Sequence, residues 1–397
     1  MNLQAGKYQN NIMKNRSHAQ YLAAVLVLYV YLPFFVLIID KTVSINVIYK
    51  YIIYSAIILY TMFRVKYINK YALIFLIFFL GTLVINMLLV PYTYYVLVEG
   101  IQALITMAIP IVIVSCKDFD ISIFVNKWSW FAKRNLPLII LAIILFKEKI
   151  VNYSIFNEIC IPNLFIYMFL LISAEIYNDK LNICLTAINV FTVILLGGRA
   201  AALTSVFLCV VALFFSNRIS VTKKIILAHL IILFVIMVFL NFYSILIWIN
   251  NLLSSIGINS RSIYLLLRQI QNGKLYVTNR DIIYSVCLDF IKKNWYLIGG
   301  FGVTLHLTNG QYYYPHNILL QMLVQFGIIG TISLLILMCV RFKMIKNRLL
   351  IMEKKYVLFS LLAFCVIGMT GSSIWLHYLS TIPVSIFFFY RTKGLNK

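Results

Sequence analysis

Long apolar runs alternate with short polar segments along most of this chain. A run of about 18 or more apolar residues is long enough to cross a bilayer as a helix. The pattern predicts an all-α integral membrane protein with about 12 transmembrane helices. The fifth is the weakest, because its apolar core, LPLIILAIILF, is short. The helices are expected at residues 21–39, 46–63, 71–90, 95–115, 132–147, 161–177, 181–196, 200–216, 224–249, 317–340, 354–372 and 374–391.

One long and mostly polar stretch, residues 250–316, interrupts this pattern. It divides the chain into nine helices within residues 1–249, a long outward-facing loop, and three helices within residues 317–397. Inside the loop, the segment DIIYSVCLDFIKK (281–293) predicts an amphipathic helix packed on the membrane face. Its apolar residues at helical spacing are Ile282, Ile283, Val286, Cys287, Phe290 and Ile291.

Composition and charge support a membrane protein. Hydrophobic residues make up 63% of the 397 positions and charged residues only 11%, whereas soluble proteins carry about 25% charged residues. The net charge of +23 would raise the question of nucleic acid in a soluble protein. Here the basic residues gather in short loops between apolar runs, which is typical of cytoplasmic loops. We therefore expect a multi-pass protein with both termini in the cytoplasm and no nucleic-acid partner.

The outer loop departs from this charge rule. Long loops can cross the membrane regardless of charge, so the orientation stands. An excess of positive charge on the outer face still requires an explanation. The charged residues concerned are Arg261, Arg268, Lys274, Arg280, Lys292 and Lys293, against only Asp281 and Asp289.

Two glycine-containing segments are expected on the same outer face. The seventh span ends in LLGGRAA, so that Gly197, Gly198 and Arg199 form the whole connection to the eighth. An arginine at this depth either extends its side chain to the surface or meets an anion, and the glycines let a headgroup approach. The second segment, IGGFG, contains Gly300 and is either a plain loop or a close approach of backbone to a ligand.

The segment QYYYPHNILLQ closes the outer loop. Asn317 is a candidate cap of the tenth span and a candidate ligand-binding residue. His316 stands outside the apolar run, where packing does not require histidine, and is suited to accept a proton or to donate to phosphate. Tyr314 is a candidate for stacking on a sugar ring.

Arg199, Arg280 and His316 are thus expected at one membrane surface, where two guanidinium groups and an imidazole suit a phosphate or pyrophosphate. Asp281 is the one nearby carboxylate, so we expect neither a metal nor a cofactor. Glu99, in the outer part of the fourth span, is expected either to accept a sugar hydroxyl or to form a structural salt bridge.

In order and sidedness, three segments resemble the O-antigen polymerase and O-antigen ligase superfamily. They are LLGGRAA, NRDIIYSVCLDFIKKNWYLIGGFG and YYPHNILLQMLVQFGIIG, within about residues 190 to 330. The chain reads GGR where many relatives have a serine before the arginine. The polymerase is the leading hypothesis and the ligase its nearest competitor.

The resemblance implies a membrane glycosyltransferase of the GT-C type in the bacterial inner membrane, with its active site on the periplasmic side. Its donor would be an oligosaccharide on undecaprenyl pyrophosphate. Arg199 and Arg280 would hold the pyrophosphate, and His316 would orient or deprotonate the acceptor. The reaction would invert the anomeric carbon without a metal.

The expected partners are this lipid-linked oligosaccharide, the bilayer and a chain-length regulator. A flippase for lipid-linked oligosaccharides is the alternative from another class. It is disfavoured because paired repeats with broken helices are not evident in the sequence. A capsule polymerase fits the same residues.

Overall fold

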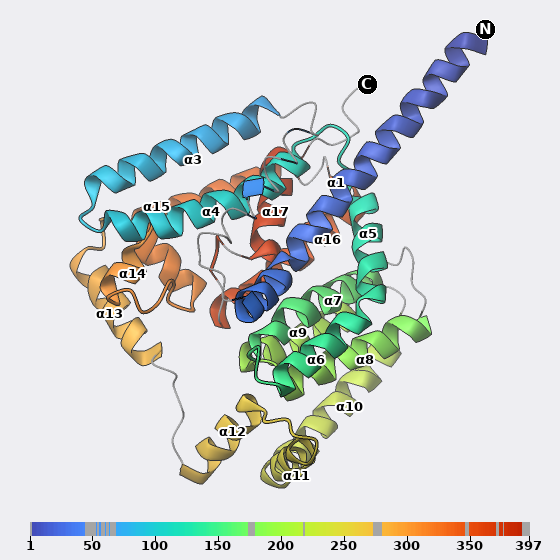
Figure 1. Ribbon diagram of the computed structural model, residues 1–397, viewed down its shortest axis with the longest axis vertical. Helices are drawn as coiled ribbons and strands as arrows, with labels where there is room; N and C mark the ends of the chain where they lie inside the picture. Colours follow the sequence, from blue (N-terminus) through green and yellow to red (C-terminus); the bar gives the residue numbers. More distant parts are fainter. Residues whose placement is uncertain are drawn as a thin grey trace. The chain divides into compact units, whose positions relative to one another are not determined.

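The computed structural model describes residues 2–43, 69–173, 179–216, 219–272, 280–345, 349–370, 373–375 and 377–390, with single positions between 53 and 63. Over these ranges the chain is helical and contains no strand (Figure 1). An all-α fold follows from the long apolar runs, because a helix satisfies all its backbone hydrogen bonds within itself at membrane depth.

The chain forms two compact units. The first unit comprises Met1–Val30, Asn46–Lys127 and Thr278–Lys397, and the second comprises Tyr31–Ile45 and Trp128–Val277. Helices α1 (Asn2–Val43) and α5 (Ile121–Arg134) contribute to both. The first unit also contains α3 (Lys70–Leu89), α4 (Thr93–Val114), α13 (Arg280–Lys293), α14 (Val303–Leu307), α15 (Ile318–Ile345), α16 (Ile351–Thr370) and α17 (Tyr378–Phe389). The second contains α6 (Leu136–Lys147), α7 (Ser154–Ser173), α8 (Asp179–Leu196), α9 (Arg199–Phe215), α10 (Val221–Leu240), α11 (Phe242–Ser255) and α12 (Arg261–Asn272).

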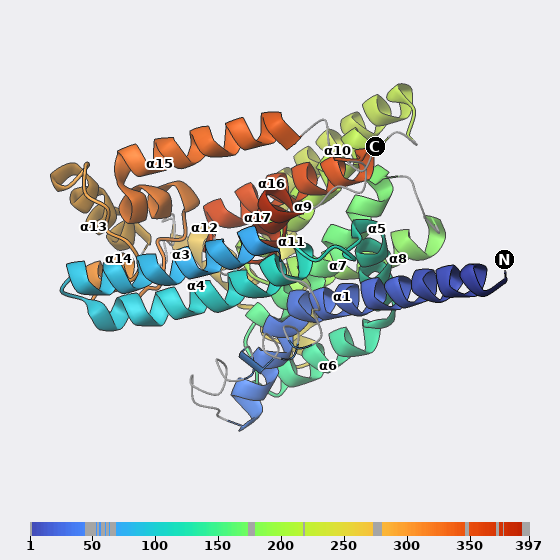
Figure 2. The ribbon, with the colours of Figure 1, turned by 90° about the horizontal axis from the view of Figure 1, so that it is seen from above.

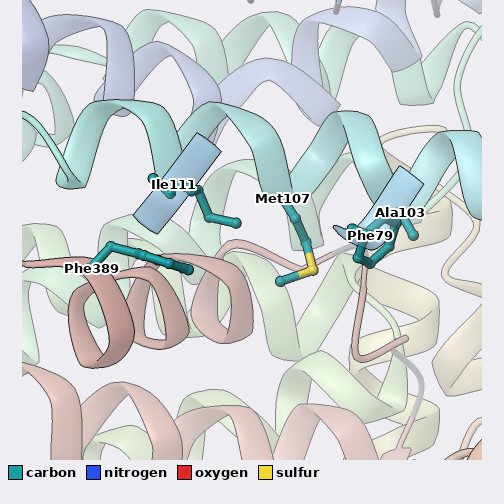
Figure 3. Close-up of a cluster of buried hydrophobic side chains, with 6 residues drawn as sticks. Phe79, Ala103, Met107, Ile111 and Phe389 are labelled. Carbon is teal, nitrogen blue, oxygen red and sulfur yellow. The ribbon is translucent and has the colours of Figure 1, made fainter. Parts of the chain in front are cut away.

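Helices α3 and α4 lie side by side in the first unit (Figure 2). Their core includes Phe79 and Met107, with Phe389 from α17. Met107 and Ile111 point from α4 toward Phe389 (Figure 3). Ala103 is fully buried in this cluster, since a small side chain lets neighbouring membrane helices approach closely.

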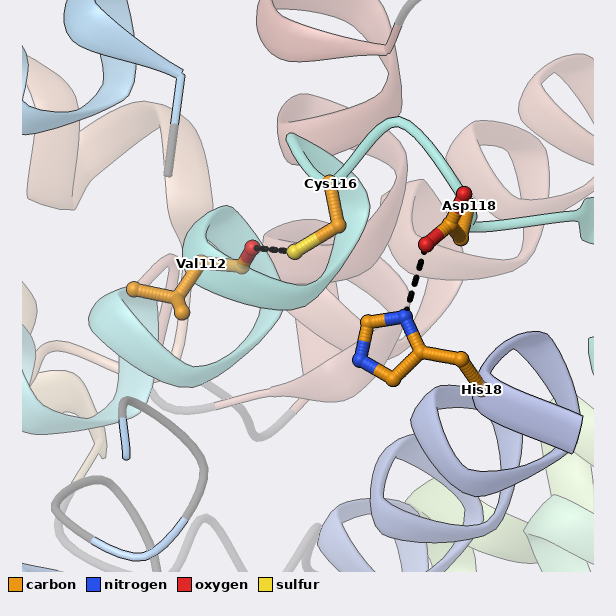
Figure 4. Close-up of polar contacts among 4 residues, drawn as sticks. All are labelled: His18, Val112, Cys116 and Asp118. Carbon is orange, nitrogen blue, oxygen red and sulfur yellow. Dashed lines mark hydrogen bonds and ion pairs between the residues drawn. The ribbon is translucent and has the colours of Figure 1, made fainter. Parts of the chain in front are cut away.

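A polar contact joins α1 to the segment after α4, also within the first unit. His18 Nδ1 and Asp118 Oδ2 lie 2.8 Å apart (Figure 4). Cys116 stands between this pair and the end of α4, where its Sγ donates to the Val112 carbonyl at 3.0 Å. Burial, followed by the nearby charge of Asp118, raises the pKa of the Cys116 thiol to about 12.

A buried cluster of amides lies at the centre of the second unit. Asn163 of α7 accepts hydrogen bonds from Tyr31 at 2.6 Å and from Asn135 at 2.8 Å. Its own amide group donates to Asn135 and Asn189, both at 3.0 Å. Polar groups in a membrane interior are costly unless they bond to one another, and these do.

The number of transmembrane helices remains a prediction. Among the described residues, five helices are long and apolar enough to cross a membrane, or six if the bent pair α5 and α6 is one span. Three shorter apolar helices, from Lys180, Arg199 and Tyr378, are additional candidates. Most of the expected second span, residues 46–63, lies outside the described residues. The GT-C architecture also remains a prediction.

Three expected spans differ from a single straight helix: the fifth, the ninth, and the tenth, in which Gly327 interrupts α15 with a φ of +66° and a ψ of 178°. The fifth is bent by 51° between α5 and α6, at Asn135, two residues before Pro137. Proline lacks an amide hydrogen and fits the first turn of a new helix, so the break falls there. The ninth ends at Leu240, and α11 begins at Phe242. Hydropathy alone did not predict the break in the ninth span, because the apolar run continues through it.

Candidate functional site

Arg280 is the first residue of α13, the helix expected within the outer loop. Ile283 and Cys287 of this helix are fully buried and share a core with Leu320 and Val324 of α15. Ile282 faces away and is 57% exposed. Because Ile283 and Cys287 lie one turn apart on the same side of the helix, α13 packs one face against α15.

The segment PHN stands at the start of α15. Asn317 Oδ1 accepts a hydrogen bond from the Leu320 amide at 3.1 Å and so caps the helix, as the sequence predicted. His316 has a φ of +56°, in a left-handed region that few residues other than glycine adopt. The Tyr314 ring meets the His316 imidazole edge-on, with centroids 4.7 Å apart. The backbone and Tyr314 together fix the orientation of this half-buried imidazole.

Arg280 and His316 flank one core. Arg280 lies three residues before the buried Ile283, and His316 four before the buried Leu320. Both residues therefore belong to ends of elements that pack together within the first unit. Arg280 and His316 therefore each stand just before a segment that contributes side chains to the same core.

The glycine segment between α13 and α14 is held on three sides. The Phe301 amide donates to Asn86 Oδ1 at 2.9 Å, and the Gly300 amide donates to the Gln325 carbonyl at 2.8 Å. The Tyr92 hydroxyl donates to the Gly299 carbonyl at 2.6 Å. Burial, followed by the charge of Glu99, raises the pKa of Tyr92 to about 12. Tyr92 therefore remains a donor at neutral pH.

At Gly300 and Gly302 the structure has no room for a side chain. Gly302 has a φ of +76°, and a Cβ there would overlap the backbone of Tyr95. Gly300 has a φ of +70°, and a Cβ there would overlap the Asn86 amide group. Close packing of this segment on α3 and α4 accounts for these glycines. Ligand binding by Gly300 remains a prediction.

Glu99 is the carboxylate that anchors this segment. Its side chain is 3% exposed. One oxygen accepts the Gly302 amide at 2.5 Å, and the other accepts Gln325 Nε2 at 2.7 Å. Gln325 in turn accepts from Trp375 Nε1 at 2.9 Å. These partners are a backbone amide and a glutamine, so Glu99 links α4, the glycine segment and α15; its binding of a sugar remains a prediction.

Gly197, Gly198 and Arg199 lie in the second unit, between α8 and α9. The Gly198 amide donates to Asn157 Oδ1 at 3.2 Å. A Cβ at Gly198 would lie 3.2 Å from the Tyr153 ring. The first turn of α7 and the residue before it therefore cover the turn from which Arg199 projects. Arg199 itself is half-buried.

Sequence reasoning missed several residues around this turn. Ser262 Oγ donates to the Gly197 carbonyl at 2.6 Å, which brings the start of α12 beside it. The Arg261 guanidinium lies 5.5 Å from the centroid of the Tyr153 ring. Glu158 follows Asn157 on α7 and is half-buried. In the sequence, Arg261 counted only toward the charge of the outer loop, and its partners are too distant in the chain to be recognised.

The predicted site residues thus divide between the two units. Arg199 and Gly198 belong to the second unit. Those of the first unit are Glu99, Arg280, Gly300, Tyr314, His316 and Asn317. The convergence of Arg199 with Arg280 and His316 remains a prediction. Over the described ranges, no group of three or more His, Cys, Asp or Glu side chains is placed to hold a metal ion.

The fold and these residues define an all-helical protein with candidate membrane spans, whose arginine and histidine side chains lie at helix starts. Residues 184–335, less than half of the chain, match a family described as O-antigen ligase. The match confirms, over this region, the resemblance to the O-antigen polymerase and ligase superfamily. It supports ligase- or polymerase-type glycosyl transfer in general terms. No curated protein and no solved structure matches the chain.

Proposed function

We propose that the protein is an O-antigen or related surface-polysaccharide polymerase at the periplasmic face of the bacterial inner membrane. It transfers the growing glycan from undecaprenyl pyrophosphate to the non-reducing end of a new lipid-linked repeat unit. The observation that carries this proposal is the family match over residues 184–335, because that range contains Arg199, Arg280 and His316.

In this proposal the acceptor hydroxyl oxygen attacks the anomeric carbon of the donor sugar from the side opposite the pyrophosphate. The bond between that carbon and the pyrophosphate oxygen breaks, and the pyrophosphate leaves with the electron pair. Inversion follows from a single displacement. Arg199 and Arg280 stabilise the negative charge that develops on the leaving group.

His316 takes the proton of the acceptor hydroxyl. Its left-handed backbone and its edge-on contact with Tyr314 support this role, because a general base must be held in one orientation toward the proton it accepts. A backbone conformation that few side chains adopt is a recurrent feature of functional sites. No metal takes part in the proposed reaction.

The proposal is tested in a polymerase-deletion strain complemented with Arg199→Ala, Arg280→Ala or His316→Ala. We expect normal protein levels, with a single repeat unit per lipid for the arginine variants and short or absent ladders for His316→Ala. Lys292→Ala, an exposed position in the last turn of α13, is the matched control and should give a full ladder. Full ladders from all three site variants would overturn the assignment.

An O-antigen ligase is the second candidate, favoured by the description of the matching family. A ligase uses the same donor and the same displacement but transfers the glycan to lipid A-core. Loss of a ligase would leave long polymer on undecaprenyl pyrophosphate with none on lipid A-core. Loss of a polymerase would leave single repeat units, so one analysis of the lipid-linked pool separates the two.

A further inference from the structure

Arg261, the first residue of α12, lies beside the same glycine turn as Arg199. Ser262 Oγ donates to the Gly197 carbonyl at 2.6 Å, and Ser260 Oγ donates to the Leu195 carbonyl at 2.6 Å. These two hydrogen bonds stand on either side of Arg261 in the chain. They fasten the start of α12 to the end of α8 and to the turn that leads directly into Arg199.

The Tyr153 ring contacts both sides of this junction. The Arg261 guanidinium lies 5.5 Å from its centroid. The same ring would lie 3.2 Å from a Cβ at Gly198, the residue before Arg199. One aromatic side chain therefore lies beneath one arginine and leaves little room for a side chain at the residue that precedes the other. All of these groups belong to the second unit.

The Arg261 side chain is exposed, and its guanidinium lies over the Tyr153 ring in a cation–π contact. A cation–π contact is an attraction to the ring face and does not occupy an oxygen acceptor, so a guanidinium in such a contact can still donate N–H groups to an oxyanion. Arg199 and Arg261 thus both adjoin the glycine turn, as the first residues of α9 and α12.

We infer that Arg261 and Arg199 together bind a phosphate group, namely the pyrophosphate of the lipid-linked donor. This inference rests on the proposed function and adds to it a residue that neither the motifs nor the family resemblance assigned. The chemistry is that of a phosphate ester, and an anionic phospholipid headgroup is a second source of the same group. The experiment therefore measures both sources.

The full-length protein in phosphatidylcholine nanodiscs is titrated with farnesyl diphosphate as the probe. We expect Arg261→Ala to weaken binding about tenfold, as expected for the loss of one charge-assisted fork. Arg261→Lys keeps the charge and the contact with Tyr153 but loses the two-pronged guanidinium. Its affinity should therefore fall between those of the wild type and Arg261→Ala. Arg268→Ala, at an exposed position further along α12, is the matched control and should bind as the wild type does.

A second titration uses phosphatidylglycerol in place of the probe. The inference predicts that Arg261→Ala leaves the response to phosphatidylglycerol unchanged. A variant that loses the response to phosphatidylglycerol but binds farnesyl diphosphate normally would assign Arg261 to a headgroup and overturn the inference. Melting curves check folding, and Arg261→Lys decides the question if the alanine variant is unfolded.

Arg199→Ala separates failure of this inference from failure of the proposed function. If Arg199→Ala weakens diphosphate binding and Arg261→Ala does not, the inference is wrong and the proposed donor stands. If neither variant changes binding, both the inference and the proposed donor are wrong. Weaker binding by both, with the Arg268 control unchanged, is the expected result.

Discussion

Glu99 accepts a hydrogen bond from the Gly302 amide at 2.5 Å, although the two residues are 203 positions apart in the chain. Through this contact the fourth helix holds the segment that links α13 to α14. Arg280 stands at the far end of α13 and His316 follows α14. The buried carboxylate therefore stabilises the segment between two predicted catalytic residues without being required to touch substrate.

The Glu99 pair predicts a specific rescue. In Glu99→Gln, the new amide group faces the Gln325 amide group, so two donors meet and we expect a loss of about 1–3 kcal/mol in unfolding free energy. Adding Gln325→Glu should restore stability. The swapped pair again satisfies the Gly302 amide, both side chains and Trp375 Nε1.

Thermal melting in detergent, with both single variants and the double variant, measures this coupling. A double variant as unstable as the sum of the two single variants would show that the hydrogen-bond chain does not hold the segment. The polysaccharide ladder gives a second readout, because a structural role predicts that the double variant regains chain growth.

Gly302 and Gly81 form a matched pair of glycines. Gly302→Ala should destabilise the protein strongly, since its φ is +76° and the added methyl group would overlap Tyr95. At Gly81, inside α3, an added methyl group would meet no atom of the described residues within 4 Å, and alanine is the better helix former there by about 1 kcal/mol. Comparable losses of melting temperature in the two variants would contradict the packing of this segment.

Sequence pattern predicted the elements of the site better than their contacts. Both the start of α13 and the cap at Asn317 follow from local signals. The start of α13 follows from the helical spacing of its apolar residues. The cap follows from an asparagine placed three residues before the Leu320 amide, whose hydrogen bond it accepts. The sequence showed the glycines near Gly300, but it did not show that close packing on α3 and α4 requires them. Asn86 is 215 positions from Phe301, and no local pattern carries a contact of that range.

The polar centre of the second unit was likewise outside the reach of the pattern. In the sequence Asn163 and Asn189 are isolated amides within apolar runs, and only the fold brings them together. The same holds for Arg261, the first residue of α12, and Tyr153, which directly precedes α7. Hydropathy predicts that a segment is apolar, whereas the choice of neighbours depends on tertiary packing.

Asn163 provides a test of that polar centre. Asn163→Ala leaves the buried Tyr31 hydroxyl and the Asn135 side chain each without one hydrogen-bond partner, so we expect a loss of about 1–3 kcal/mol. Ser173→Ala is the control, because within the described residues the hydroxyl of this half-buried serine donates to the Leu170 carbonyl of its own helix, at 3.3 Å. Equal melting temperatures for the two variants would show that the amide cluster contributes little.

Thiol labelling tests both the burial of α13 and its predicted side of the membrane. Cys287 is fully buried, and burial raises the pKa of its thiol to about 12. Ser285 is exposed on the same helix. In a chain whose other cysteines are replaced by alanine, Cys287 should resist a membrane-impermeant maleimide at pH 7 to 9, because the thiolate is the reactive form.

A chain with Ser285→Cys as its sole cysteine should react in intact spheroplasts, and faster as the pH rises toward about 8.5, the pKa of an exposed thiol. Labelling of Cys287 in the folded protein would contradict its packing against α15, and a Ser285→Cys variant that reacts only after lysis would place α13 in the cytoplasm.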